Sequence, residues 1–233
     1  MTLRLAVFGC LVFLAGCTHL RPRRYPTVDQ VPGGVFLEPE VDSRLELERQ
    51  ASPLPLEGLE LTKRSEGFRS HLYDDAVKYC TIAYGHLVKK APCDGTESAD
   101  FRRGLSMEQG THLLTHDMDR VRQSVTALVQ VEMSDGQYGA LCDFFFNVGG
   151  TNFSKSTLLR VINSKQNDRI PMQFKNDRIP MQFRRWIIAD GKALDALRSR
   201  REKEITLFFE GLPVPTTPEE AAASPIDIRR GEE

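Results

Sequence analysis

Residues 66 to 86 read Glu66-Gly-Phe-Arg-Ser-His-Leu-Tyr-Asp-Asp75-Ala-Val-Lys-Tyr-Cys-Thr81-Ile-Ala-Tyr-Gly-His86. This stretch decides the fold because it joins the end of a helix, a polar loop and a strand-like run. The segment before it places Leu56, Leu59 and Glu66 on one helical face, and the glycine after Glu66 suits a helix C-terminus. Residues 79 to 88 are rich in β-forming types and alternate in polarity, which predicts a small sheet.

Two carboxylates and a hydroxyl follow one another within this stretch. We expect Glu66 to face the apolar side of its helix, where burial raises a carboxyl pKa as a general acid requires. Asp75 follows nine residues later in a loop, and Thr81 six residues after that. This order is typical of a glycosidase site in which one carboxyl donates a proton while the other holds a water. An exposed glutamate at a helix end is the alternative for Glu66 taken alone.

Composition limits the size and class of the protein. The chain has 233 residues with a formal net charge of −1, which suits one ordinary domain with tails. It lacks the basic footprint of a nucleic-acid-binding protein, so we expect no nucleic-acid partner. His112 and His116 share one helix face, but no third metal ligand accompanies them. We therefore predict no metal and no cofactor.

The N-terminus has the features of an export signal. Arg4 precedes an apolar run over residues 5–14 that is too short for a stable membrane span. The run ends in Leu14-Ala-Gly-Cys17, which resembles the lipobox of bacterial lipoproteins. That resemblance implies cleavage before Cys17, a lipid on Cys17 and an anchor in the membrane. Thr18, in place of Asp, resembles lipoproteins sorted to the outer membrane, facing the periplasm of a Gram-negative bacterium. An ordinary signal peptide is the alternative.

The rest of the chain divides by composition. After the leader (1–17), residues 18–54 contain several prolines and show no sustained period, which predicts a flexible tether. The globular domain is expected over 55–212. From 213 to 233 the chain is rich in Pro, Ala and Glu, which predicts a disordered tail.

The cysteines that remain after export would lie in an oxidising compartment. Cys142 falls in an apolar helix and is expected to be a buried thiol. Cys80 and Cys93 flank a predicted hairpin and could pair, although sequence alone does not supply the Cα separation that a disulfide needs. A zinc site using Cys80, His86 and Cys93 would lack a second pair of ligands.

Helix signals dominate the second half of the domain. Ser106 with Gln109, and Ser134 with Gln137, fit the capping box at a helix start. A last helix is expected to begin at the Ser199-Arg-Arg-Glu202 cap and to end at Gly211.

A nonapeptide is duplicated in tandem, as Asn167-Asp-Arg-Ile-Pro-Met-Gln-Phe-Lys175 and again at 176–184 (together 167–184). Nine residues are two and a half helical turns, so an in-line insertion would rotate the following face by half a turn. We expect the second copy to lead into a helix containing Trp186, and the first copy to be extruded as a loop or an extra turn.

Several motifs together resemble phage-type lysozymes, glycoside hydrolase family 24. The matching motifs are Glu66-Gly-Phe-Arg, Tyr73-Asp-Asp75, Thr81-Ile-Ala-Tyr-Gly-His86, Phe146-Asn-Val-Gly149, Ser156-Thr-Leu-Leu-Arg160, Arg185-Trp186 and Arg200-Arg201-Glu-Lys-Glu204. The resemblance covers about residues 56 to 210. It implies an α+β, lysozyme-like fold in which a small β-hairpin or sheet subdomain and a larger helical lobe enclose the active-site cleft.

The resemblance also assigns roles. The family cleaves the β-1,4 bond between N-acetylmuramic acid and N-acetylglucosamine in peptidoglycan, and is generally described as inverting. Glu66 would protonate the leaving oxygen, and Asp75 with Thr81 would hold the attacking water. Phe146 and Ser156 would contact sugar, and His86, grouped with them, would support the architecture of the site. We expect a monomer whose partners are glycan strands of peptidoglycan and the membrane.

The sequence departs from the family pattern at a few positions. Ala83 replaces a usual glycine, and Asp74 beside Asp75 leaves the second carboxylate ambiguous by one position, although the spacing favours Asp75. The usual Gly-Leu before the late Arg-Arg pair reads Ala196-Leu197.

Two other functions compete with hydrolysis. A lytic transglycosylase would need only the glutamate, and a wall-binding lipoprotein would need neither carboxylate.

A late basic cluster could also attract the acidic peptides of peptidoglycan, although such a run is more often a solvated helix face. Its members are Arg184, Arg185, Lys192, Arg198, Arg200 and Arg201.

Overall fold

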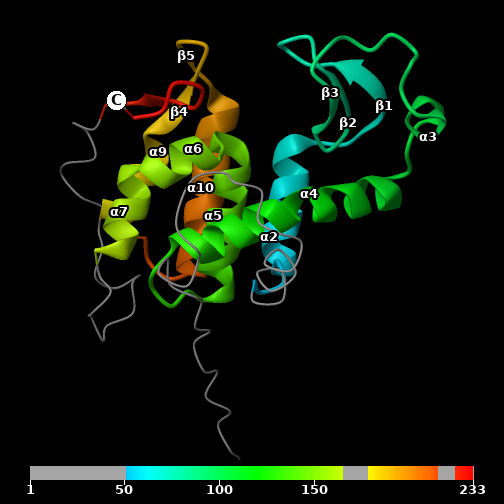
Figure 1. Ribbon diagram of the computed structural model, residues 1–233. Helices are drawn as coiled ribbons and strands as arrows, with labels where there is room; N and C mark the ends of the chain where they lie inside the picture. The colour runs from blue at the N-terminus through cyan, green and yellow to red at the C-terminus, as the bar shows by residue number, and fades with distance from the viewer. Residues whose placement is uncertain (1–50, 165–177, 215–223, 233) are drawn as a thin grey trace, which may run out of the picture.

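The structure is a computed structural model that describes residues 51–164, 178–214 and 224–232. It has a small lobe of three strands and a larger helical lobe, and a long helix, α4, runs between them (Figure 1). This is the α+β, lysozyme-like architecture expected from the sequence. The helices are α2 (Leu56–Glu66), α3 (Ala99–Arg103), α4 (Met107–Leu128), α5 (Asp135–Val148), α6 (Gly150–Lys155), α7 (Thr157–Asn163), α9 (Arg178–Arg184) and α10 (Asp195–Phe209).

The small lobe is built on an antiparallel sheet in the order β1 (Arg69–Asp74), β2 (Cys80–Ala83) and β3 (His86–Lys89). All four residues of β2 are buried. Tyr73 on β1 lies opposite Thr81 on β2. This register brings the loop that holds Asp75 close to Thr81, as the predicted site requires.

Both predicted capping boxes are confirmed. The Ser106 hydroxyl accepts from the Gln109 amide at the start of α4, and Ser134 does the same for Gln137 at the start of α5. In each box the glutamine side chain accepts from the serine amide in return. These local bonds satisfy amides that have no partner inside the helix, which fixes where each helix begins.

The helix that ends at Glu66 crosses α5 through two glycines. A Cβ atom added to Gly58 would lie 2.7 Å from the Cα of Gly139. The two backbones therefore meet without side chains between them, and any larger residue would force the helices apart. This crossing sets the position of α2 against the helical lobe, and so the position of Glu66.

A second sheet, in the order β5-β4-β6, differs from two expectations. Trp186 was expected in a helix, but it begins strand β4 (Trp186–Ala189) and is fully buried against Phe144. The tail was expected to be disordered, but Ile226 and Asp227 form strand β6, which pairs in parallel with β4. Backbone bonds from Ile226 to Arg185 (2.6 Å) and from Ile228 to Ile188 (2.8 Å) satisfy the edge of β4. The remaining strand, β5, covers Lys192–Ala193.

The last helix begins earlier than the sequence indicated. α10 starts at Asp195 after Leu194, so Ser199 lies inside it and does not cap it. Burial of Leu197 explains the earlier start, because the first turn already packs on the core. Residues 178–184 of the second nonapeptide copy form α9, whereas the first copy and residues 176–177 lie outside the described residues.

The predicted leader and residues 18–50 of the predicted tether lie outside the described residues. For residues 51–54 the expected flexible tether is wrong, because Ala51 is buried and the Ser52 carbonyl accepts a hydrogen bond of 2.9 Å from Arg122. Within the described ranges, no helix is both long enough and apolar enough to cross a bilayer.

Candidate active site

Glu66 is the last residue of α2, and Gly67 ends the helix with a positive φ of 71°. The expected apolar face is wrong at its first position, because Leu56 is 67% exposed. The helix instead buries Gly58, Leu61 and Thr62. The side chain of Glu66 is 24% exposed, so it lies at the edge of the core and can reach a bound molecule.

The two carboxylate oxygens of Glu66 have different surroundings. Oε1 accepts a hydrogen bond of 2.6 Å from Nη1 of Arg200. Oε2 faces Gly85, where an added Cβ would lie 3.5 Å away, and no side chain in the described ranges hydrogen bonds to it. The expected apolar surroundings of Glu66 are therefore wrong, because the guanidinium of Arg200 binds one of its oxygens. The other oxygen is left facing the small lobe.

A buried carboxylate holds Arg200 in turn. Asp143 accepts from Nε of Arg200 at 3.0 Å and from Nη2 at 2.8 Å, and its side chain is 0% exposed. Two parallel charge-assisted bonds fix the guanidinium in orientation as well as position. Asp143 thus determines where Arg200 meets Glu66.

Arg201 and Glu204 on α10 form a second buried pair. Arg201 donates from Nη2 to Glu204 at 2.8 Å and to Asn147 at 2.7 Å, and its guanidinium lies over the ring of Phe144. Burial raises the pKa of Glu204 well above its ordinary value, and Arg201 offsets this only in part. Burial would also raise the pKa of Asp143, but the charge of Arg200 and its hydrogen bonds bring it below its ordinary value.

These directions indicate the charges of the network. The raised pKa favours the neutral, protonated form of Glu204, and the lowered pKa favours the ionised form of Asp143. Asp143 and Arg200 then form a buried pair of opposite charges, which avoids the large cost of an uncompensated buried charge.

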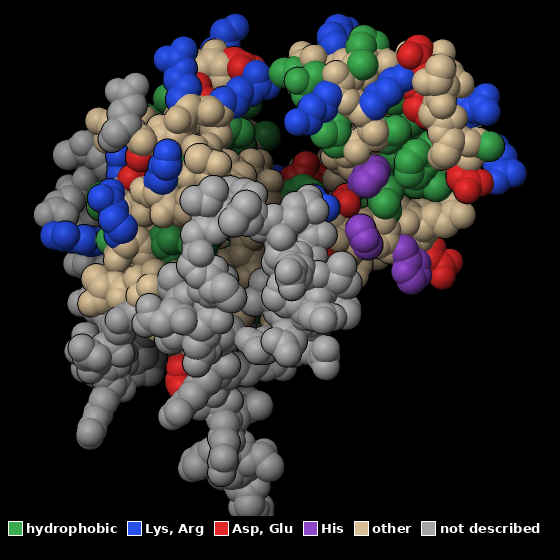
Figure 2. All heavy atoms as spheres, in the orientation of Figure 1, with side chains coloured by type: hydrophobic (Ala, Val, Ile, Leu, Met, Phe, Trp, Pro, Cys, Tyr) green, Lys and Arg blue, Asp and Glu red, His purple; other side chains and the backbone are tan. Residues whose placement is uncertain are grey.

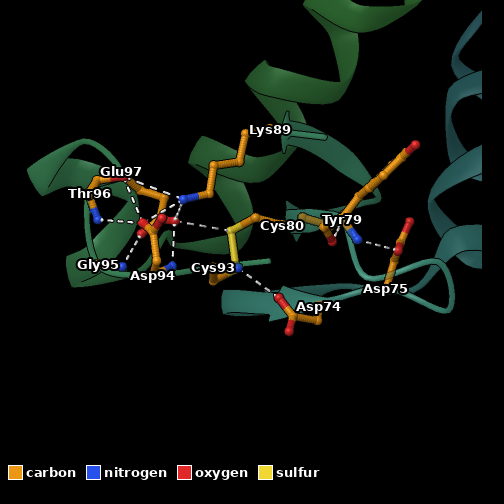
Figure 3. Close-up of a disulfide and its surroundings, with 11 residues drawn as sticks. Asp74, Asp75, Tyr79, Cys80, Lys89, Cys93, Asp94, Gly95, Thr96 and Glu97 are labelled. Carbon is orange, nitrogen blue, oxygen red and sulfur yellow. Dashed lines mark hydrogen bonds and ion pairs between the residues drawn. A yellow bond between two sulfur atoms is a disulfide. The ribbon is translucent and has the colours of Figure 1, made fainter. Parts of the chain in front are cut away.

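The loop after β1 separates Asp74 from Asp75 (Figure 3). Asp74 is turned toward the disulfide and accepts from the Cys93 amide at 2.8 Å. Asp75 is turned toward the other side of the loop, where Oδ1 accepts from the Val77 amide at 2.9 Å and from the Tyr79 amide at 2.8 Å. The two neighbours therefore differ in role: Asp74 fixes the disulfide loop, and Asp75 orders its own turn.

Tyr73 is half-buried on β1. Burial raises the pKa of the Tyr73 hydroxyl, Arg69 above its ring lowers it, and the charges of Glu66 and Asp75 both raise it further. Figure 2 shows a hollow between the two lobes with acidic side chains at its floor. Oε2 of Glu66 faces Gly85 in the turn between β2 and β3, and the same sheet carries Thr81 and the loop of Asp75.

Thr81 lies beside this region on β2. Its hydroxyl donates to the Tyr79 carbonyl at 3.0 Å, and the residue is 4% exposed. The oxygen keeps a lone pair for a water or sugar hydroxyl, but little of the side chain is accessible.

The three residues expected near the substrate have different positions. His86 pairs through Nδ1 with Asp117 at 2.8 Å and so joins β3 to α4, which fits the expected architectural role. Phe146 is half-buried near the end of α5, where one side of its ring packs on the core. Ser156 is fully buried, accepts from the Leu159 amide and caps α7, so its expected contact with sugar is wrong.

The possible disulfide is present. Cys80 and Cys93 are bonded, and Cys142 is a buried free thiol whose pKa is raised by burial.

Within the described ranges, one group of potential metal ligands has its ligand atoms close together, and it consists of Cys80, Cys93 and Glu97. Its two sulfurs are bonded to each other, and Glu97 is paired with Lys89 at 2.7 Å. A hydrogen bond from Lys89 lowers the pKa of Glu97 to about 2.

Sequence reasoning gave no role to several residues of this site. Arg200 was noted only as part of a motif and a basic cluster, and Glu204 only as part of that motif. Asp143 and Asp117 were not singled out. The one available signal was the Arg-Arg-x-x-Glu pattern of α10, which puts Arg200 and Glu204 one turn apart on the same helix face.

A small three-stranded lobe, a larger helical lobe and Glu66 at the end of α2 facing the small lobe together define a lysozyme-like fold. Comparison with known proteins identifies the family. The phage lysozyme family model matches residues 63–204, more than half of the chain. The protein therefore belongs to the phage lysozyme family.

Relatives and solved structures agree. The endolysin of Salmonella phage P22 is 35% identical over 152 residues, covering 65% of this chain and 94% of that protein. A crystal structure of a mutant P22 lysozyme superposes with a TM-score of 0.55 at 31% identity, covering 67% of this chain and 98% of that one. The muramidase domain of SpmX from Asticaccaulis excentricus has the same fold, with a TM-score of 0.54 at 24% identity over 66% of this chain and 96% of that one.

Proposed function

We propose that the protein is a peptidoglycan hydrolase of lysozyme type, a muramidase that cleaves the β-1,4 bond between N-acetylmuramic acid and N-acetylglucosamine. The observation that carries the proposal is that Oε2 of Glu66 faces Gly85 in the β2–β3 turn of the small lobe, whose sheet also carries Thr81 and the loop of Asp75. Membership of the phage lysozyme family supports the same activity.

In the proposed reaction Glu66 is the acid. Oε1 is held by Arg200, so Oε2 is the atom that carries the proton toward the glycosidic oxygen. The bond from that oxygen to the anomeric carbon breaks as the proton arrives, and the leaving sugar departs with a free hydroxyl. Because Arg200 is itself fixed by Asp143, Oε2 has one preferred direction.

Asp75 and Thr81 act on the other side of the sugar. Oδ1 of Asp75 is occupied by two amides, which leaves Oδ2 to hold and polarise a water. The water attacks the anomeric carbon as the leaving oxygen departs, and its proton passes to Asp75. The Thr81 hydroxyl, which already donates to the Tyr79 carbonyl, accepts a hydrogen bond from the same water.

The proposed setting is the periplasmic face of the outer membrane. The Leu-Ala-Gly-Cys sequence that ends at Cys17 supports lipidation there, and the proline-containing stretch over 18–50 supports a tether between lipid and enzyme.

Mass spectrometry of the products from purified peptidoglycan tests the activity. The wild type should release fragments with reducing muramic ends, Glu66→Gln should release none, and Glu57→Gln on the exposed face of the same helix should match the wild type. Anhydro-muramyl ends would identify a lytic transglycosylase instead. If the wild type yields no fragments, the hydrolase proposal fails.

A further inference from the structure

The loop that carries Asp75 joins β1 to β2 and has little packing of its own. Residues 76–78 are exposed, and Lys78 adopts a positive φ of 64°. No residue from 74 to 79 is buried. Hydrogen bonds that compete with water are individually weak. The position of Asp75 therefore depends on what holds the two ends of this loop.

Tyr79 makes the contacts that order Asp75. Its amide donates to Oδ1 of Asp75 at 2.8 Å, and its carbonyl accepts from the Asp75 amide at 2.9 Å. The same carbonyl accepts from the Thr81 hydroxyl at 3.0 Å. The two residues that hold water in the proposed reaction thus meet at the backbone of Tyr79. A shift of Tyr79 would move both of them.

A disulfide begins at the next residue. Cys80 is 0% exposed, and its sulfur is bonded to that of Cys93. The Cys93 amide donates to Oδ1 of Asp74 at 2.8 Å, and Asp74 lies opposite Cys80 in the register of β1 and β2. Figure 3 shows Asp74 reaching Cys93 at one end of this arrangement and Asp75 reaching Tyr79 at the other. The disulfide therefore ties both ends of the loop to one covalent bridge.

The far side of the disulfide is itself anchored. Cys93 is followed by a turn in which Glu97 accepts from the amides of Asp94 at 3.0 Å and Gly95 at 2.9 Å. The Glu97 side chain is 1% exposed and pairs at 2.7 Å with Lys89 on β3. The disulfide therefore joins the exposed loop to a turn that β3 holds in place.

We propose that the Cys80–Cys93 disulfide is a positioning device for Asp75, and that hydrolysis requires its oxidised form. The inference rests on the proposed function, in which Asp75 holds the attacking water. The bridge acts through two contacts, the Asp74 carboxylate at one end of the loop and the Tyr79 backbone at the other. A bridge that only stabilised the fold would leave the rate of each folded molecule unchanged.

Reduction by a dithiol would open the bridge through thiol–disulfide exchange. Cys93 is the accessible sulfur, because Cys80 is fully buried and Cys93 is only partly buried. A thiolate of the dithiol attacks the Cys93 sulfur, the S–S bond breaks, and Cys80 leaves as a thiolate that takes up a proton. The second thiol then attacks the mixed disulfide and releases Cys93. Two electrons and two protons pass to the cystine, and the dithiol becomes a disulfide.

Kinetics on purified peptidoglycan test the proposal with full-length protein, oxidised or reduced by dithiothreitol, at a temperature where circular dichroism shows both forms folded. We expect reduction to lower kcat at least roughly tenfold and to change KM by less than about twofold, because the glycan still binds while the water is misplaced. Reoxidation should restore kcat. Hydrogen exchange over residues 74–81 should become faster on reduction, whereas exchange in α5 should not change.

Asp74 allows a test that leaves the disulfide intact. Asp74→Ala removes the acceptor of the Cys93 amide and should lower kcat several-fold, whereas Asp74→Asn keeps a carbonyl acceptor and should retain a near wild-type rate. Because Asp74 and the disulfide act on one loop, reduction of Asp74→Ala should lower kcat by less than the product of the two separate factors. Cys142→Ser, a change at a buried thiol outside the loop, should respond to dithiothreitol as the wild type does.

The remaining outcomes decide against the inference. Equal kcat values for the folded oxidised and reduced protein overturn it, as does a loss of kcat without faster exchange over 74–81. Independent effects of reduction and Asp74→Ala overturn it too. Cys80→Ala combined with Cys93→Ala should be slow and insensitive to dithiothreitol, and a further loss on reduction would place the thiol effect elsewhere.

The same measurements separate this inference from the proposed function. Hydrolysis that reduction leaves unchanged refutes this inference alone. An inactive oxidised wild type refutes the proposed hydrolase, and hydrogen exchange over 74–81 then still shows whether the disulfide holds the loop.

Discussion

Arg200 and Glu66 lie 134 positions apart in the chain, yet Nη1 of Arg200 is 2.6 Å from Oε1 of Glu66. The contact joins α10 to the end of α2. Because Asp143 holds the same guanidinium from α5, three helices meet at the acid. The position of Glu66 is therefore a property of the helical lobe, while Asp75 and Thr81 belong to the small lobe.

Replacing Arg200 with Gln should affect both stability and rate. Asp143 would be left buried without its cation, which costs about 3–5 kcal/mol of unfolding free energy. The acid would also lose its anchor, so kcat should fall at least roughly tenfold at a temperature where the variant is folded. Urea denaturation and turbidity assays on cell walls measure the two effects. Arg103→Gln serves as the control, and wild-type activity in folded Arg200→Gln would show that the contact does not position the acid.

Amide substitution should lower the unfolding free energy strongly at Asp143 but only slightly at Glu204. Asp143→Asn removes the ionised partner of Arg200 and should cost about 3–5 kcal/mol. Glu204→Gln replaces a carboxyl whose raised pKa favours its neutral form, so it should change the unfolding free energy by less than about 1 kcal/mol well below pH 4.5, where that carboxyl is protonated in both the folded and the unfolded chain. Chemical denaturation of both variants checks this. A large loss for Glu204→Gln would mean that Glu204 is ionised.

The pH dependence of stability follows from the same two groups. The pKa of Asp143 is lowered from 3.8, so its contribution is present above that value and is lost as the pH falls through the folded-state pKa. The pKa of Glu204 is raised above 4.5, so its contribution is complete below 4.5 and declines as the pH rises toward the folded-state pKa. The stability of wild type relative to Glu204→Gln should therefore fall as the pH rises from 4.5. A difference that stays constant with pH would contradict the assignment.

Removing the disulfide should loosen the small lobe. The bond closes a loop with a sequence separation of 13, and constraint of the unfolded chain by such a loop is worth about 3 kcal/mol. Cys80→Ser combined with Cys93→Ser should lower the unfolding free energy by about that amount, as measured by urea denaturation. Cys142→Ser does not touch the loop and distinguishes loss of the cross-link from loss of a thiol. An unchanged midpoint in the double variant would rule out a stabilising role for the bond.

The crossing of α2 and α5 at Gly58 and Gly139 should tolerate no larger side chain at Gly58. In Gly58→Ala the new methyl would lie 2.7 Å from the Cα of Gly139, a backbone atom that cannot rotate away. Overpacking of this kind costs about 1–3 kcal/mol, and the shift of α2 would move Glu66 as well. Thermal unfolding and wall-hydrolysis rates should therefore both fall. A Gly67→Ala variant tests the contrast, because its Cβ meets no atom within 4 Å and its cost comes only from the φ of 71°.

Local features of the chain were predictable from the sequence. The capping boxes at Ser106 and Ser134 depend only on residues three positions apart, and both helices begin where the boxes indicate. The Cys80–Cys93 pairing remained open because it depends on a Cα separation, which is 4.8 Å in the structure.

Features that depend on distant residues were not predictable in the same way. Trp186 is in a strand because residues 226–228 pair with it from the far end of the chain. Leu56 fits a helical apolar face by spacing, but no element of the described structure covers it, and it stays 67% exposed. The position of Glu66 next to Arg200 likewise depends on how three helices pack.

The adjacent carboxylates of Asp74 and Asp75 allow the most direct test of the two-carboxylate account. Asp74 bonds to the Cys93 amide, and Asp75 faces the opposite side of the loop beside Tyr79. The measurement is the rate of muramic reducing-end release from peptidoglycan by Asp75→Asn and Asp74→Asn. The account predicts a loss of at least roughly a hundredfold for Asp75→Asn and a near wild-type rate for Asp74→Asn. A near wild-type rate for Asp75→Asn would contradict it.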